Sequence, residues 1–195
     1  MKKAIICTAF AGLVSGAGGQ DFSLSITGPT VVGSGSFSIQ VIGDSSFGTH
    51  MLGGAFSLVS NSDLVTDITW TPASWSAFNE DSEGYLGNGN YGQVVFGQLL
   101  LPIPGFDTPA AGSELGGMIG FFEVVVVLGP GFGPIDFQLV AASPFTLEVL
   151  DTAAFETRQD IDGNLTLNGW AVNGPTPSSI GLLAFGGLAA SRRRR

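Results

Sequence analysis

The sequence predicts an all-β fold, a single antiparallel β-sandwich, from its composition and its alternation of apolar and polar residues. The chain has 195 residues, of which 30 are glycine and only 12% are charged, a composition that suits strands and tight turns. Many short runs alternate apolar and polar residues and are separated by Gly, Pro, Asn and Asp. No run shows a 3.6-residue period, so we expect helices only outside the sandwich, one in a signal peptide at the N-terminus and one in a hydrophobic segment at the C-terminus.

Residues 1–17 have the pattern of a secretory signal peptide. Lys2 and Lys3 give a positive start, residues 4–14 are apolar and uncharged, and residues 15–17 form a small-x-small cleavage site, with cleavage expected after Ala17. The only cysteine, Cys7, lies in this segment. The mature protein is therefore expected to lack a disulfide, a thiol nucleophile and a thiolate metal ligand.

Residues 18–173 are expected to form the acidic sandwich. The cleanest period-2 runs are Phe22–Ile26 and Phe37–Val41. The other predicted strands are Ala55–Val59, Leu64–Trp70, Gln93–Leu101, Gly117–Leu128, Ile135–Ala141, Phe145–Leu150 and Leu165–Trp170. Because residues 121–127 are almost wholly apolar, we expect that strand to lie inside a sheet, and we expect residues 79–92 and 102–116 to be long polar loops.

Residues 174–195 have the organisation of a sorting tail. Pro175 and Pro177 flank Thr176 and keep the junction extended, since proline cannot donate to a ladder. Residues 180–190 carry no charge and could enter a bilayer as a short helix. Four arginines follow, and the positive-inside rule keeps such a cluster on the cytoplasmic side of the membrane: Arg192, Arg193, Arg194 and Arg195.

This tail resembles the PEP-CTERM sorting signal that exosortases recognise. The resemblance covers residues 175–195 and departs from the family at Thr176, where the usual residue between the prolines is Glu. It implies export across the inner membrane, a transient stay in that membrane, and processing by a signal peptidase and an exosortase-like enzyme. The protein would then reach the cell envelope, the outer surface or the extracellular matrix.

The middle of the chain resembles a cohesin-like domain of secreted bacterial proteins, a jelly-roll-like sandwich. The resemblance rests on the strand at residues 35–41, the motif at residues 53–58, the glycine-rich entry at residues 115–117 and the long valine strand that follows. It covers most of the mature chain as a pattern and carries no residue-specific motif. Binding of a dockerin is therefore not assigned to any position.

The charge distribution restricts the partners of the domain. Between residues 18 and 174, Arg158 stands against 16 carboxylates, which gives a formal charge of −15. A surface of this sign repels nucleic acid and anionic lipid. We therefore expect no nucleic-acid partner, and extracellular polysaccharide or surface proteins remain as candidates.

Two motifs that could indicate catalysis or nucleotide binding are better explained as structural. His50 is the only histidine, and no Gly-x-Ser-x-Gly elbow accompanies it, so we expect a loop or sheet-surface residue. Residues 87–92 match G-x-G-x-x-G, but they lack the preceding strand and following helix that a dinucleotide site needs. Those glycines are expected to shape a turn, and no cofactor is expected.

A weak calcium candidate lies in Asp160, Asp162 and Asn164. These residues resemble positions 1, 3 and 5 of a calcium loop, but Leu165 replaces the glycine at position 6 and Ala171 replaces the glutamate at position 12. A hairpin turn at residues 162–163 accounts for the same residues.

Aromatic and acidic residues leave two further functions open. The tryptophans could stack on sugars, and we expect Trp75 to be exposed and Trp70 and Trp170 to pack in the core. A pair of carboxylates could hydrolyse glycosides if suitably spaced, although 16 of them make some close pair inevitable. The leading expectation is a non-enzymatic envelope or matrix protein, with a protein- or carbohydrate-binding module second and a secreted hydrolase third.

Overall fold

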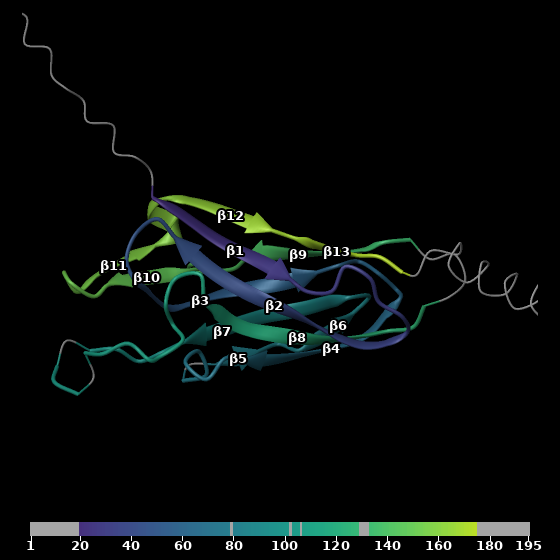
Figure 1. The fold of residues 1–195 in the computed structure, drawn as a ribbon, viewed down its shortest axis with the longest axis horizontal. Helices are drawn as coiled ribbons and strands as arrows, with labels where there is room; N and C mark the ends of the chain where they lie inside the picture. The colour runs from purple at the N-terminus through teal and green to yellow at the C-terminus, as the bar shows by residue number, and fades with distance from the viewer. Residues whose placement is uncertain (1–19, 79, 102, 106, 129–132, 175–195) are drawn as a thin grey trace, which may run out of the picture.

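The described residues form a sandwich of two β-sheets packed face to face (Figure 1). The computed structural model describes residues 20–78, 80–101, 103–105, 107–128 and 133–174. Within this part of the chain no helix is long and apolar enough to cross a membrane. The predicted signal peptide with Ala17 and the tail from Pro175 to Arg195 lie outside the described residues.

The first sheet has five strands in the order β12-β1-β2-β8-β4. Their bounds are β1 Asp21–Thr27, β2 Gly35–Ser45, β4 Val65–Pro72, β8 Met118–Val126 and β12 Asn164–Asn168. As expected from its run of valines, β8 lies inside the sheet, between β2 and β4. One ladder departs from the antiparallel prediction, because β12 runs parallel to β1.

The second sheet has eight strands, and β3 pairs with three of the others, β7, β9 and β10. Their bounds are β3 His50–Val59, β5 Asp81–Ser82, β6 Tyr85–Gly87, β7 Asn90–Gly97, β9 Ile135–Ala141, β10 Glu148–Asp151, β11 Glu156–Gln159 and β13 Trp170–Val172. One edge of β3 pairs with β7, and the other pairs with β10 near His50 and with β9 near Val59. β9 and β10 therefore pair one after the other with the same edge of β3, and the segment between them interrupts this pairing.

The core lies between the sheets and is formed by the alternating apolar positions of both. Phe56 of β3 is fully buried at its centre. Its ring lies 5.6 Å from Trp70, 5.7 Å from Phe96 and 6.2 Å from Phe122, measured between centroids. These aromatic contacts connect β4 and β8 of one sheet to β3 and β7 of the other, so they hold the layers in register.

Several strand predictions needed correction. The expected loop over residues 79–92 contains β5 and β6, and the expected strand Phe145–Leu150 begins only at Glu148. The expected hairpin at residues 162–163 is wrong, because β11 and β12 belong to different sheets. A 3-10 turn at Asp160–Asp162 carries the chain from one layer to the other.

Candidate binding groove

The described surface contains a groove of about 370 Å³ on the outer side of the second sheet. Val94 and Phe96 of β7 are buried in the core, so the alternating Gln93 and Val95 face the opposite side, away from the first sheet. The groove is lined by these outward residues, by the first half of β3 and by two flanking segments. Its apolar lining consists of Leu52, Ala55, Val95, Leu99, Leu100, Pro144 and Phe145.

Two glycines make the floor of the groove possible. A Cβ at Gly54 would lie 2.1 Å from the carbonyl oxygen of Thr146, and one at Gly53 would lie 2.7 Å from that of Phe96. Gly54 therefore lets the backbone of residues 143–147 cross close to β3, and Gly53 lets the backbone of β7 lie close to it. The crossing is fixed by a hydrogen bond of 3.1 Å that the Ala55 amide donates to the Phe145 carbonyl.

Asp160 holds this crossing segment in place. Its carboxylate oxygen Oδ1 accepts hydrogen bonds from the Thr146 amide at 2.7 Å and the Leu147 amide at 2.9 Å. The Asp160 amide donates in turn to the Leu147 carbonyl at 3.0 Å. Because Asp160 is buried, these bonds replace its hydration. This residue therefore positions one wall of the groove.

Gln98 holds the opposite wall. Its side-chain amide donates to the Met51 carbonyl at 2.7 Å, and its side-chain oxygen accepts from the Ala110 amide at 2.8 Å. These bonds attach the chain after β7 to β3 and fold the following loop back onto the sandwich. Leu99, next to Gln98, stays 45% exposed at the rim of the groove.

Carboxylates flank the apolar floor. Glu148 of β10 lines one side of the groove and accepts a hydrogen bond of 3.0 Å from Gln159. Asp81 and Glu83 line a neighbouring hollow that shares Gln93 with the groove. The groove therefore has an apolar floor and an acidic rim.

The residues of the calcium candidate differ in burial and in their hydrogen bonds. Asp160 is buried and bonded to backbone amides, whereas Asp162 and Asn164 are exposed. The Asn164 side chain donates to Asp21 at 3.2 Å instead. Among the residues that the structure describes, no three His, Cys, Asp or Glu side chains gather closely enough to hold a metal ion.

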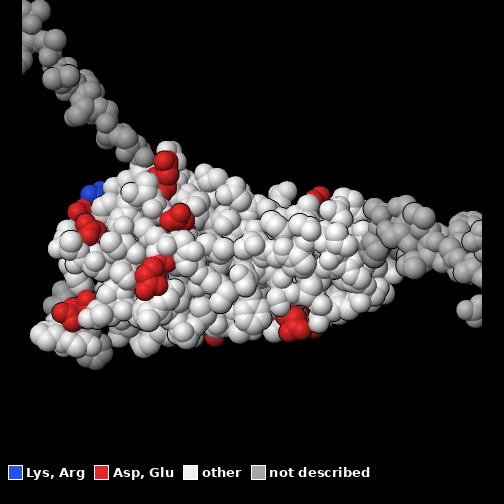
Figure 2. All heavy atoms as spheres, in the orientation of Figure 1, with Lys and Arg blue, Asp and Glu red and all other residues white. Residues whose placement is uncertain are grey.

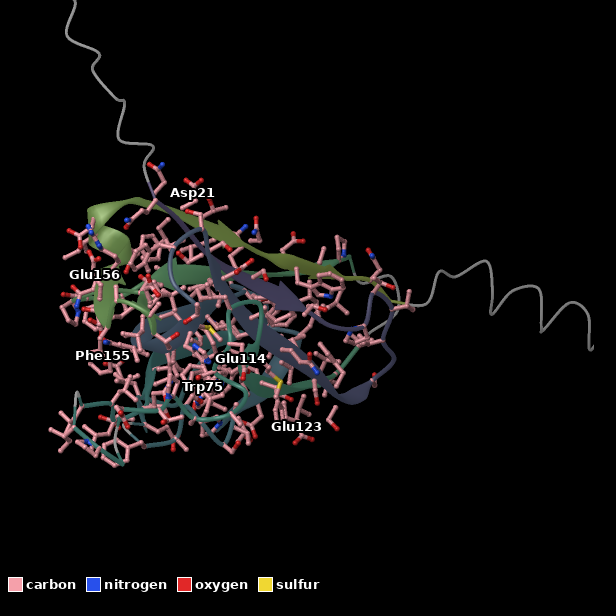
Figure 3. The ribbon with its side chains drawn as sticks, turned by 60° about the vertical axis from the view of Figure 1, so that its left-hand side comes forward. Asp21, Trp75, Glu114, Glu123, Phe155 and Glu156 are labelled. Carbon is pink, nitrogen blue, oxygen red and sulfur yellow. The ribbon has the colours of Figure 1, made fainter. Side chains whose placement is uncertain are left out.

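The other singled-out residues have structural positions. Trp75, expected to be exposed, is buried and donates from Nε1 to the Met118 carbonyl at 2.8 Å (Figure 3). Trp70 packs in the core as expected, and Trp170 is partly buried against it and donates from Nε1 to the Pro29 carbonyl at 3.0 Å. Residues 87–90 form the predicted turn, with positive φ at Asn88 and Gly89. His50 is the first residue of β3, where its Nδ1 is 2.9 Å from the Thr49 hydroxyl.

Comparisons with known proteins support the fold. No protein-family model matches the chain, and no curated protein matches its sequence. Among solved structures, a chain of a type I cohesin–dockerin complex from Clostridium thermocellum superposes with a TM-score of 0.53 at 9% identity, covering 80% of this chain and 99% of that chain. The second type II cohesin module from the adaptor scaffoldin ScaA of Acetivibrio cellulolyticus gives a TM-score of 0.52 at 7% identity, covering 80% and 98%. The domain therefore has the cohesin fold.

Proposed function

We propose that the chain is an exported, non-enzymatic protein-binding module that presents the groove on its second sheet to a partner protein. The proposal rests on the groove itself. Its floor includes Gly53, Gly54 and Ala55, and its two walls are the segments held in place by Asp160 and by Gln98. A preformed concave surface of this kind lowers the entropic cost of binding, because its walls need no ordering. The solved complex with the same fold is one between a cohesin and a dockerin, which supports a protein as the ligand.

The chemistry of the groove defines the partner. Leu52, Val95 and Phe145 would receive an apolar side chain, and Glu148 and Glu83 would pair with basic residues around it. The formal charge of the domain, one arginine against 16 carboxylates, adds a long-range attraction for a basic surface. The partner is thus a protein with an apolar anchor surrounded by lysine or arginine.

Site-specific photocrosslinking in the producing cells tests the binding face. A benzoylphenylalanine at Leu99, at the rim of the groove, is expected to give a discrete adduct with another protein. The matched control places the same group at Thr69, an exposed position of β4 on the other sheet. Adding Glu148→Lys to the Leu99 variant should weaken the adduct, since it reverses a charge at the rim. Equal adducts from both labelled positions, or none at Leu99, would contradict a groove-directed partner.

We also propose that residues 1–17 direct export and that the tail is read by an exosortase-type enzyme. The motif at Pro175–Pro177, the uncharged segment and the terminal arginines support this route. Mass spectrometry of the protein from the envelope or medium should show that residues 1–17 and the arginines are absent. A variant with Pro175→Ser and Pro177→Ser should keep its tail. An intact C-terminus on the wild-type envelope protein would refute the sorting proposal and leave the groove proposal unaffected.

A further inference from the structure

The fold ends at Asn173, beside the loop that joins β1 and β2. The Asn173 amide donates to the Thr30 carbonyl, and the Val32 amide donates to the Asn173 carbonyl, each at 2.9 Å. Val172 before it is buried in the core. Among the described residues, Asn173 is the last one hydrogen-bonded to the sandwich, and it lies two positions before the first proline of the tail.

This short junction limits how far the sandwich can stand from a membrane that holds the tail. Residues 174–177 span at most about 14 Å when fully extended. The headgroup layer of a bilayer is about 5–8 Å thick on each side. If residues 178–191 enter the bilayer, as the sorting proposal requires, the end of the sandwich must therefore lie at or close to the headgroups.

The surface at this end is nearly uncharged and carries two exposed valines; we call it the exit surface. It consists of the described residues of the loops at this end of the sandwich, residues 28–34, 60–64, 87–90, 127–128, 133–134 and 173–174. Val31 is 59% exposed and Val127 is 61% exposed. Asp63 is the single carboxylate among these described loop residues.

The opposite end of the sandwich carries most of the acidic residues. In Figure 2 most of the visible carboxylates lie toward that end, and fewer lie on the half nearer the end of β13. Asp21 and Glu156 lie there, far from the end of β13 (Figure 3). That end also contains Asp107, Glu114, Asp151 and Asp162.

We infer that the exit surface rests on the lipid headgroups while the tail is in the membrane, with Val31 and Val127 against the interface. Anionic lipid repels the acidic end, so the charge distribution favours an orientation in which that end points away from the bilayer. Exposed valines at the near end gain by entering the interfacial region. The groove is lined by the first half of β3 and the second half of β7, nearer the acidic end, so this orientation presents it away from the membrane.

Fluorescence quenching from lipid headgroups tests this orientation. Residues 18–195 contain every described residue and lack the only cysteine, Cys7, so a single new thiol can be labelled. Labels at Val31→Cys and, as a control of similar exposure, at Ile161→Cys are compared in vesicles of phosphatidylcholine and phosphatidylglycerol that carry a headgroup nitroxide. The label at position 31 is expected to be quenched several-fold more than the label at position 161. Equal quenching would overturn the inference.

Two further measurements separate this inference from the sorting proposal on which it rests. A label at Ala184→Cys, with a nitroxide on the acyl chain, reports whether the tail has inserted. No quenching at position 184 contradicts tail insertion itself, whereas quenching at 184 without quenching at 31 contradicts only the exit surface. Inserting about ten Gly-Ser residues after Gly174 adds about 17 Å of root-mean-square reach and should abolish the difference between positions 31 and 161.

Discussion

Replacing Gly54 by alanine is the sharpest test of how the groove is built. The new methyl carbon would lie 2.1 Å from the Thr146 carbonyl oxygen, so the crossing segment must move by about 1 Å to reach an ordinary contact distance. That shift strains the Ala55–Phe145 hydrogen bond and the bonds from Thr146 to Asp160. Overpacking costs about 1–3 kcal/mol and a lost backbone bond about 1 kcal/mol. Alanine also restricts the unfolded chain more than glycine does, and this offsets about 0.4–1 kcal/mol of the loss in stability.

The expected net loss of about 1–3.5 kcal/mol corresponds to a fall in Tm of about 2–14 °C for a domain of this size. Thermal unfolding followed by circular dichroism measures it, and hydrogen exchange at the Thr146 and Leu147 amides localises it. Gly33→Ala is the matched control, because no atom lies within 4 Å of its new Cβ and its φ is not positive. A Gly54→Ala protein as stable as the Gly33→Ala protein, with unchanged exchange, would refute the crossing geometry.

Two further predictions concern the acidic turn after β11. Asp160→Ala should lower the free energy of unfolding by about 3 kcal/mol, because two amides of the crossing segment lose a charged acceptor. Asp162 is exposed, so Asp162→Ala should change the free energy of unfolding by less than about 0.5 kcal/mol. Urea unfolding of both variants measures the difference, and equal losses would contradict the assigned role of Asp160. Calcium should leave the Tm of the wild-type domain unchanged, since the Asp160 carboxylate already accepts hydrogen bonds from two backbone amides. A rise in Tm with calcium that Asp162→Ala abolishes would show that the turn binds the ion.

The period-2 pattern was sufficient to predict the long strands but not the short ones. β1, β2 and β8 lie within or close to their predicted ranges, because several successive inward residues specify one buried face. β5, with two residues, and β6, with three, are too short to show a period. β11 is polar throughout and pairs only with β10, so its pairing depends on a partner that local sequence does not reveal.

The groove was not predicted, although part of its signal is present in the sequence. Two adjacent glycines inside an otherwise apolar strand, Gly53 and Gly54, indicate a close backbone approach. The identity of the approaching segment depends on Thr146, which is distant in sequence. The role of Asp160 was not predicted for the same reason. The sequence placed it in a calcium-like pattern, and its hydrogen bonds to the Thr146 and Leu147 amides depend on the tertiary structure.

By itself, the sequence determined the fold class and the acidic character of the domain, and it predicted the route of export. These properties are local or additive, because alternation, charge and terminal segments can each be assessed within a short window. The tertiary structure decided which surface is concave, that Trp75 is buried, and that the exposed Val31 and Val127 lie at the end where the chain leaves the sandwich. Those properties arise from contacts between segments far apart in the chain, and only the folded arrangement of the two sheets specifies them.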